Sequence, residues 1–360
     1  MAKQPLKYEP DYAVAPGATL KEVLEEKGIS QTALATRSGL AEKTISQIIN
    51  GVAPITYETA EKFELALGVP ARFWNQRELE FRENLAGITS RDRLKTEVAW
   101  LDEVPVEVLK KRGYIDEHET DKPSLVRLVL KFFGVSSVEA WRETWGKPAV
   151  QYRGGSAVDR HPGYVAAWLR MGELQAEAIA TAPFDADEFR RALADVRKMT
   201  VLPASEWLPQ LIARCAAAGV AVVFTKEIPS AAVSGATQWL TKDKALLQLS
   251  LKFKTNDQIW FSFFHEAGHI LLHSKKQVFV EFGANNSTDE EKEANEFARD
   301  QLIPPSHAAR LPFLKNRAQI RQFAHAIGIA PGIVVGRLQK DDLAFPSAFY
   351  DLKVKINWAE

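Results

Sequence analysis

The sequence predicts a mainly helical fold with one small β-sheet, in the α+β class. Short helical patterns that end in glycine fill residues 16–68, and amphipathic helical spacing continues through residues 77–134. Residues 137–215 also follow helical spacing, with tryptophans as large apolar anchors. Strand-like runs are concentrated in residues 220–251, where short β-rich segments are separated by turn residues. A small sheet is therefore expected within a largely helical chain.

Length and composition limit the classes of protein that fit. A chain of 360 residues suits two or three domains, and Lys+Arg and Asp+Glu are equal at 46 each, so no global charge indicates a nucleic acid or membrane partner. Cys215 is the only cysteine, which excludes an internal disulfide and suits a reducing compartment. The N-terminus lacks the apolar run of a signal peptide, and no window has the length of a membrane span. We expect a soluble, cytoplasmic protein with no membrane partner.

The changes in pattern along the chain predict four segments. The first is a compact helical unit, the second a helical middle region, the third contains the strand-like runs and a histidine-containing helix, and the last is a short tail. Their expected bounds are residues 1–76, 77–215, 216–340 and 341–360.

The first unit contains the pattern of a helix-turn-helix. Ser30 is suited to cap a helix, and Gly39 permits the sharp turn into a second helix. Exposed polar side chains at the start of that second helix would stand where a recognition helix meets base edges. The apolar residues expected to face inward are Leu34, Ala35, Leu40, Ile45 and Ile48.

This stretch resembles the Cro/C1-type repressor family. The residues that carry the resemblance are Gln31, Leu34, Ala35, Gly39, Ile45, Ser46, Ile48 and Gly51. The resemblance implies that Gln31 would hold a phosphate and that Lys43, Thr44 and Gln47 would face the major groove. Glu42 departs from a purely basic surface. The alternative is a four-helix scaffold whose polar face is merely solvated, because the helix-turn-helix also serves as a protein-interaction module.

The continuation "PITYETAEKFELALGVPARFW" resembles antitoxins of the HigA type. Such antitoxins bind their own operator as dimers. The resemblance therefore implies operator DNA as a partner, a homodimer, and a cognate toxin.

The stretch "FFHEAGHILLH" predicts a metal site on a helix that Thr255 or Asn256 can cap. Four-residue spacing places His265 and His269 one turn apart on the same face, where both imidazoles can hold one zinc ion. Glu266 would then lie beside a water and act as general base in peptide hydrolysis. The alternative is chance, because two histidines around a glutamate form a short pattern.

A third ligand is expected on the downstream helix in "STDEEKEANEFARDQLIPP". Its acidic candidates are Glu290, Glu291, Glu293 and Glu296, and its buried face is defined by Ala294, Phe297, Ala298 and Leu302. On a helical wheel Glu296 points away from that face, Glu293 lies at its edge and Glu290 within it. The helical pattern alone leaves Glu290 and Glu293 open.

From about Val220 to Pro305 the chain resembles the peptidase domain of the ImmA/IrrE family, whose second motif matches "EANEFA" at 293–298. The resemblance implies Glu293 as the third ligand, and zinc as the metal, although the same ligands accept manganese. Ser234 to Ala236 would lie on a strand that pairs with an extended peptide. His273 is expected beside the metal ligands rather than among them.

No oxyanion partner can be assigned from spacing. His325 and Arg337 are candidates, with a structural role as the alternative for each.

Together the two halves predict a DNA-binding transcriptional regulator, a HigA-like antitoxin or repressor of its own operon. It would carry a zinc-dependent endopeptidase that cleaves a repressor or partner protein. The alternative is a non-proteolytic antitoxin whose C-terminal domain only binds a toxin or ligand. From the unperturbed imidazole pKa of ~6.5, metal affinity is expected to fall below about pH 6.

Overall fold

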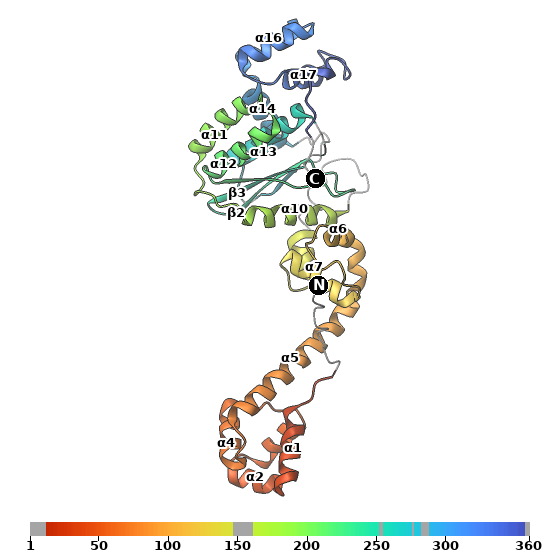
Figure 1. Cartoon of the computed structure of the whole chain (residues 1–360), viewed down its shortest axis with the longest axis vertical. Coiled ribbons are helices and arrows are strands. Elements are labelled where there is room, and N and C mark those ends of the chain that lie inside the picture. The colour runs from red at the N-terminus through yellow and green to blue at the C-terminus, as the bar shows by residue number, and fades with distance from the viewer. Residues whose placement is uncertain are drawn as a thin grey trace. The chain divides into compact units, whose positions relative to one another are not determined.

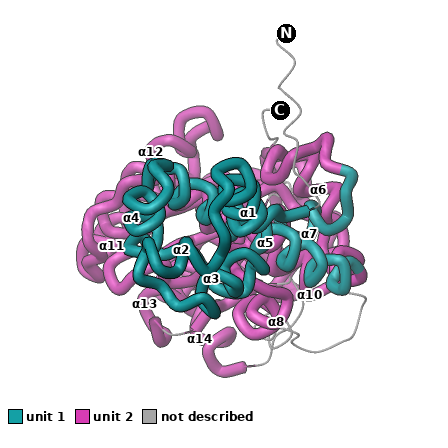
Figure 2. Tube along the Cα trace, turned by 90° about the horizontal axis from the view of Figure 1, so that it is seen from below, with its two compact units in different colours: residues 1–98, 120–127 teal, residues 99–119, 128–360 magenta. Residues whose placement is uncertain are grey.

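The structure is a computed structural model that describes residues 12–146, 161–250, 252, 255–275, 277–281 and 288–356. Its contacts divide the chain into two compact units, coloured separately in Figure 2. Unit 1 comprises residues 1–98 and 120–127, and unit 2 comprises residues 99–119 and 128–360. The expected fold class is confirmed, because the described residues are mostly helical and include one four-stranded sheet.

Unit 1 contains the predicted helix-turn-helix. The Ser30 hydroxyl accepts a hydrogen bond from the Ala33 N–H at 3.1 Å, and Gly39 makes the turn with a φ of 69°. Ile45 and Ile48 are buried, as the pattern requires. The helices of this unit are α1 (Pro16–Lys27), α2 (Gln31–Ser38), α3 (Glu42–Ile49), α4 (Tyr57–Leu67), α5 (Ala71–Thr96) and the first part of α7 (Lys122–Phe133).

Close contact between α1 and α3 holds the second helix of the motif in place. A Cβ atom on Gly17 would lie 2.1 Å from the Ile48 carbonyl oxygen, so only glycine permits this approach of the two backbones. On α5, Trp74 is fully buried and packs edge-on against Phe63 of α4, with 5.5 Å between ring centroids. Helix α3 therefore presents its outer face from a fixed scaffold.

Short helical elements connect this unit to the sheet. Trp100, Phe133 and Trp141 pack together in unit 2, with 5.3 Å between the two indole centroids. The elements are η1 (Val98–Glu103), α6 (Val106–Lys111), α7 (Lys122–Phe133), α8 (Val138–Trp141) and η2 (Arg142–Gly146).

The sheet of unit 2 is covered on both faces. Helix α10 (Pro162–Glu177) lies on one face, while α12 (Ala204–Ala216) and α13 (Asn256–Leu272) lie on the other (Figure 1). Strand β1 is parallel to β3, and β2 is antiparallel to both β3 and β4. The strand order is β1-β3-β2-β4, with β1 at Val220–Phe224, β2 at Gly235–Thr241, β3 at Lys244–Leu249 and β4 at Phe279–Glu281.

Helix α13 lies between the sheet and the helices that follow it. It contacts β2 and β3 on one side and α14 and α17 on the other. Because it is buried nearly all round, its sequence is apolar on every face except at the histidines and a few polar positions. The helices on this side of the sheet are α11 (Ala186–Met199), α12 (Ala204–Ala216), α13 (Asn256–Leu272), α14 (Asp289–Leu302), α15 (Pro305–Ala308), η3 (Leu311–Phe313), α16 (Arg317–Ile327) and α17 (Pro331–Lys340).

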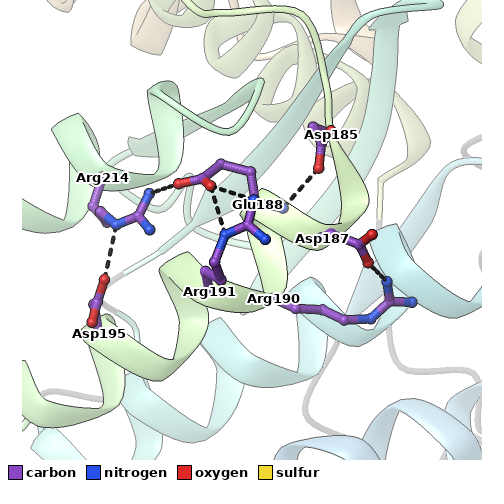
Figure 3. Close-up of polar contacts among 7 residues, drawn as sticks. All are labelled: Asp185, Asp187, Glu188, Arg190, Arg191, Asp195 and Arg214. Carbon is purple, nitrogen blue, oxygen red and sulfur yellow. Dashed lines mark hydrogen bonds and ion pairs between the residues drawn. The ribbon is translucent and has the colours of Figure 1, made fainter.

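Helices α11 and α12 come from the expected middle region, and they pack into the core of the sheet domain. Arg214 of α12 reaches two carboxylates of α11, Glu188 and Asp195, as Figure 3 shows. These charges are partly exposed, so we assign most of the stability of this contact to buried apolar residues. Those residues are Phe189, Leu193, Trp207 and Leu211.

The segment expected as a tail is docked on the start of α13. The Asn256 N–H donates to the Val354 carbonyl at 2.8 Å, and the Val354 N–H donates to the Asn256 side-chain oxygen at 3.0 Å. Lys353 pairs with Asp257 at 2.7 Å, and both side chains are less than a tenth exposed. This docking follows the short helix η4 (Tyr350–Leu352). In the part of the chain that the structure describes, no helix has the length and apolarity needed to span a bilayer.

Candidate metal centre

Helix α13 carries the metal-site pattern in the interior of unit 2. His265, Glu266 and His269 are at most 2% exposed. Gly268 lets α14 approach, because a Cβ at this position would lie 3.2 Å from the Ala294 Cα atom. Helix α14 can therefore bring a carboxylate to the two histidines.

Three side chains converge at this contact. The Nε2 atoms of His265 and His269 are 3.1 Å apart. The Glu291 carboxylate lies against both, 3.3 Å from His265 Nε2 and 3.7 Å from His269 Nε2. Among the described residues, this trio of His265, His269 and Glu291 forms the group of histidine and acidic side chains whose ligand atoms lie close enough to share a metal ion.

The expected third ligand, Glu293, lies elsewhere. Its carboxylate is 3.1 Å from the His273 Nε2 atom, and its side chain is 60% exposed. The reason is helical periodicity: Glu291 precedes Ala294 by three residues and Ala298 by seven, so it belongs to the face that packs on α13. That spacing was available in the sequence and disfavours Glu293, but it does not separate Glu291 from Glu290, which precedes Ala294 by four residues and Phe297 by seven.

The trio fits a zinc ion. Zinc takes imidazole nitrogen and carboxylate oxygen at about 2.0–2.2 Å in a tetrahedral arrangement, which places neighbouring ligand atoms about 3.3 Å apart. The two Nε2 atoms are 3.1 Å apart, and the Glu291 oxygens nearest to them lie at 3.3 Å (Oε2 to His265) and 3.7 Å (Oε1 to His269). With one ligand atom from each residue, all three lie within 4.8 Å of one another. Two nitrogens and one carboxylate also leave a coordination position for water or substrate.

His273 continues the chain of contacts behind His269. The two Nδ1 atoms are 2.9 Å apart, and His273 Nε2 faces Glu293. A hydrogen bond to the ring nitrogen opposite the metal fixes the orientation and tautomer of a ligand histidine. This geometry agrees with the expected place of His273 beside the ligands. Glu293 contacts His273, which in turn contacts the ligand His269.

Glu266 is held against the sheet. Its Oε2 atom is 2.6 Å from the Thr237 hydroxyl on β2, while its buried Oε1 atom has no hydrogen-bond partner among the described residues. Gly235 leaves room for this carboxyl group, because a Cβ there would lie 2.5 Å from Oε1. Sequence reasoning missed Thr237 and Gly235 in this role, since only the packing of β2 on α13 reveals it.

Burial sets the proton affinity of Glu266. Loss of water raises the pKa of its carboxyl group to about 8, helped by the negative charges of Glu281 and Glu291 and opposed by His265 and the Thr237 hydrogen bond. A carboxyl group with a pKa near neutrality can accept a proton and return it, as general acid–base catalysis requires.

The two histidines differ in proton affinity although they are neighbours. Burial lowers the pKa of His265, but the hydrogen bond with Glu291 and the charges of Glu281, Glu266 and Glu291 outweigh it and raise that pKa to about 9. Burial and the charges of His265 and His273 lower the pKa of His269 to about 2. Without metal, the proton is therefore on His265, where it pairs with Glu291.

The structure corrects the expected role of the strand at Ser234 to Ala236. This strand is not free to pair with an extended peptide, because β2 bonds to β3 on one side and to β4 on the other. Gly235 is paired with Glu281 of β4, and the Ser234 N–H donates to the Glu281 carbonyl at 2.7 Å.

The two oxyanion candidates lie in different surroundings. His325 is exposed on α16. Arg337, on α17, lines a cavity that also reaches His265 and Glu291.

The candidate DNA-contacting residues lie on α2 and α3 of unit 1. Gln31 is exposed at the start of α2, and Lys43 is exposed in the first turn of α3. Thr44 and Gln47 are half-buried on α3. All four lie on α2 or α3, and none of them belongs to the buried face of these helices, which is made by Leu34, Ala35, Ile45 and Ile48.

Comparison with known families agrees with this geometry. A sequence model of the family described as Helix-turn-helix matches residues 20–74, and one of the family described as IrrE N-terminal-like domain matches residues 215–338. The chain carries both domains in one polypeptide. It is a DNA-binding regulator with a protease-like domain. A search of curated proteins finds no match to this chain.

Replacing Glu291 should remove the metal, whereas the same change at Glu293 should not. Glu291→Gln takes a charged oxygen away from both histidines, and we expect zinc content to fall from about one per chain to near zero. Glu293→Gln is the matched control, because Glu293 reaches only His273. Elemental analysis of both purified variants measures the difference. Loss of zinc from Glu293→Gln with full retention in Glu291→Gln would reverse the assignment.

Zinc binding should release a proton over a wide pH range. Because the pKa of His265 is raised to about 9 and that of His269 is lowered to about 2, only His265 must lose its proton to bind zinc at pH 7. The affinity for zinc should then rise about tenfold per pH unit and level off near pH 9. With an unperturbed imidazole pKa of ~6.5 it would level off at lower pH. Titration calorimetry in two buffers of different ionisation enthalpy counts the protons. Equal affinity at pH 7 and pH 9 would contradict this protonation pattern.

Proposed function

We propose that the C-terminal domain is a zinc-dependent endopeptidase that cleaves a repressor or partner protein, and that the helix-turn-helix binds the operator of its own operon. The observation that carries this proposal is the convergence of His265, His269 and Glu291 next to the buried Glu266. A metal site without catalysis would not require a buried carboxyl group held beside it by Thr237.

The residues of the site divide the work of peptide hydrolysis. A zinc ion held by the trio would supply a Lewis acid for the peptide carbonyl and the attacking water. Glu266 takes the proton of that water on its carboxylate and passes it to the departing amine. Thr237 holds the same carboxyl group in place. Manganese would suit the same ligands.

For the N-terminal domain, we propose contacts of two kinds. Gln31, at the start of α2, binds a backbone phosphate. Lys43, Thr44 and Gln47 meet base edges in the major groove, where an amide can read adenine and an ammonium can read guanine. As in the HigA-type antitoxins that this stretch resembles, two chains would bind two half-sites of one operator.

The alternative is a non-proteolytic antitoxin, in which the C-terminal domain holds a toxin or ligand. It shares the DNA-binding half with the first proposal, so proteolysis and not DNA binding separates them.

Removing the general base should abolish cleavage while leaving the metal in place. Glu266→Gln keeps the size of the side chain and its contact with Thr237, but it cannot accept the proton, and we expect at least a hundredfold slower cleavage. The zinc-loaded wild-type chain and the variant are each incubated with a cell extract, and new protein N-termini are identified by mass spectrometry.

Zinc content and thermal unfolding of both proteins serve as controls. Termini produced by the wild type and absent with Glu266→Gln support the endopeptidase. If both samples contain the same new termini, or if neither contains any, the endopeptidase is overturned and the non-proteolytic antitoxin is the remaining proposal.

Truncating Gln47 should weaken specific DNA binding without affecting non-specific binding. Loss of a base contact costs about 1–3 kcal/mol and relaxes the preference at one position. The probe is a DNA fragment that the wild-type chain selects from a random library, and Gln47→Ala is compared with Glu22→Gln, an exposed change on α1. Equal loss in the two variants, or a uniform loss on unrelated DNA, would count against base recognition by Gln47.

A further inference from the structure

A cavity of about 580 Å³ opens beside the metal centre, and the proposed function does not yet account for it. His265 and Glu291 form part of its wall, so an occupant would lie next to the metal ligands. The volume is typical of a ligand pocket and exceeds what one side chain fills. The rest of the wall comes from α13, α14, α17, the end of β4 and the docked C-terminal segment.

The charge of the wall favours an anion. Asp257 and Lys353 pair with each other, and Glu291 lies against the histidines. This leaves Arg299, Arg337 and Lys340 opposite Glu281, and of these Arg337 also pairs with Asp341 outside the wall. A zinc ion would add further positive charge at the histidines. The basic residues of the wall are Arg299, Arg337, Lys340 and Lys353, and the acidic ones are Asp257, Glu281 and Glu291.

Arg337 offers the group that would bind such an anion. Its Nε atom donates to Asp341 at 2.6 Å, but its Nη1 atom is buried and has no hydrogen-bond partner among the described residues. A buried donor left without an acceptor costs about 1–3 kcal/mol, which an occupant with an acceptor oxygen would recover. Guanidinium groups bind carboxylates with both strength and directional preference.

Asp257 adds a second requirement on the occupant. Its Oδ1 atom is also buried without a hydrogen-bond partner in the described residues, while Oδ2 is engaged by Lys353. A peptide supplies both kinds of group, since a backbone N–H can donate to Asp257 while a carboxylate accepts from Arg337.

We propose that this cavity is a substrate subsite and that Arg337 selects a carboxylate there, either an aspartate or glutamate side chain or the free C-terminus of the substrate. The inference rests on the proposed endopeptidase and narrows its substrates to chains with an acidic group next to the cleaved bond. Arg337 acts in recognition, on the part of the substrate beyond the reacting carbonyl.

The test uses short peptide hydroxamates, whose hydroxamate group anchors on zinc, with glutamate, glutamine or lysine as the adjacent side chain. Their binding to the zinc-loaded full chain is measured by calorimetry. We expect the glutamate compound to bind at least tenfold more tightly than the glutamine compound, a difference of about 1.4 kcal/mol. Each compound is made with a free and an amidated C-terminus, so that the two sources of the carboxylate are distinguished.

Two variants test the residue itself. Arg337→Gln should remove the preference for glutamate while zinc content stays unchanged. Asp341→Asn is the matched control, because it breaks the same ion pair on α17 but removes no group from the cavity wall. If both variants lose the preference, the effect comes from α17 rather than from Arg337, and the role of Arg337 is overturned.

The comparison among compounds needs only the wild-type chain, so it remains decisive if Arg337→Gln does not fold. Equal binding of the three compounds, or a preference for lysine, would overturn the subsite while the zinc centre stands. A chain that takes up no zinc would overturn the proposed function and this subsite with it, and elemental analysis identifies that result before any peptide is added.

Discussion

Burial of helix α13 is the constraint on which the rest of unit 2 depends. A helix in this position should be apolar throughout, yet it carries two histidines and a glutamate within two turns. Ionisable groups this far from water cost several kcal/mol each unless they face partners. Glu291 and Thr237 supply those partners from two different elements, so the chemistry of the centre and the packing of the domain are the same set of contacts.

The partners are themselves fixed by their neighbours. Strand β2 lies between β3 and β4, and this double pairing leaves Thr237 little freedom. On the opposite side, the small residues Gly268 and Ala294 set how closely α14 can approach. A site whose groups stand on interior elements keeps its geometry better than one built on loops. The donors in unit 2 are therefore arranged before a metal ion arrives.

Local patterns in the sequence were sufficient for much of this fold. Ser30, Gly39 and the apolar spacing between them defined the helix-turn-helix, because caps and turns depend on near neighbours. The histidine pair was found for the same reason. The third ligand was assigned to Glu293 by resemblance, although the apolar stripe of α14 runs through Glu291. Helical periodicity places both Glu290 and Glu291 on that face, so the choice between them depends on how α14 packs against α13.

Other features had no local signal. The pairing of β2 with β4 depends on contacts across a long stretch of chain, and nothing near Ser234 indicates which edge of the strand is free. In the sequence, Thr237 has only the features of an ordinary strand residue, and its contact with Glu266 depends on the packing of α13 against β2. The cavity at Arg337 is formed by segments from three helices, the end of β4 and the C-terminal segment, so its charge could not be derived from any one of them.

The docking of Lys353 and Val354 on the start of α13 also affects the order in which the protein forms. During synthesis, α13 leaves the ribosome long before the segment that pairs with Asp257 and Asn256. Until that segment arrives, the buried Asp257 carboxylate lacks its cation and one wall of the cavity is absent. The N-terminal unit can meanwhile bury its own core. A nascent chain would thus reach a state able to recognise DNA before its cleft is complete.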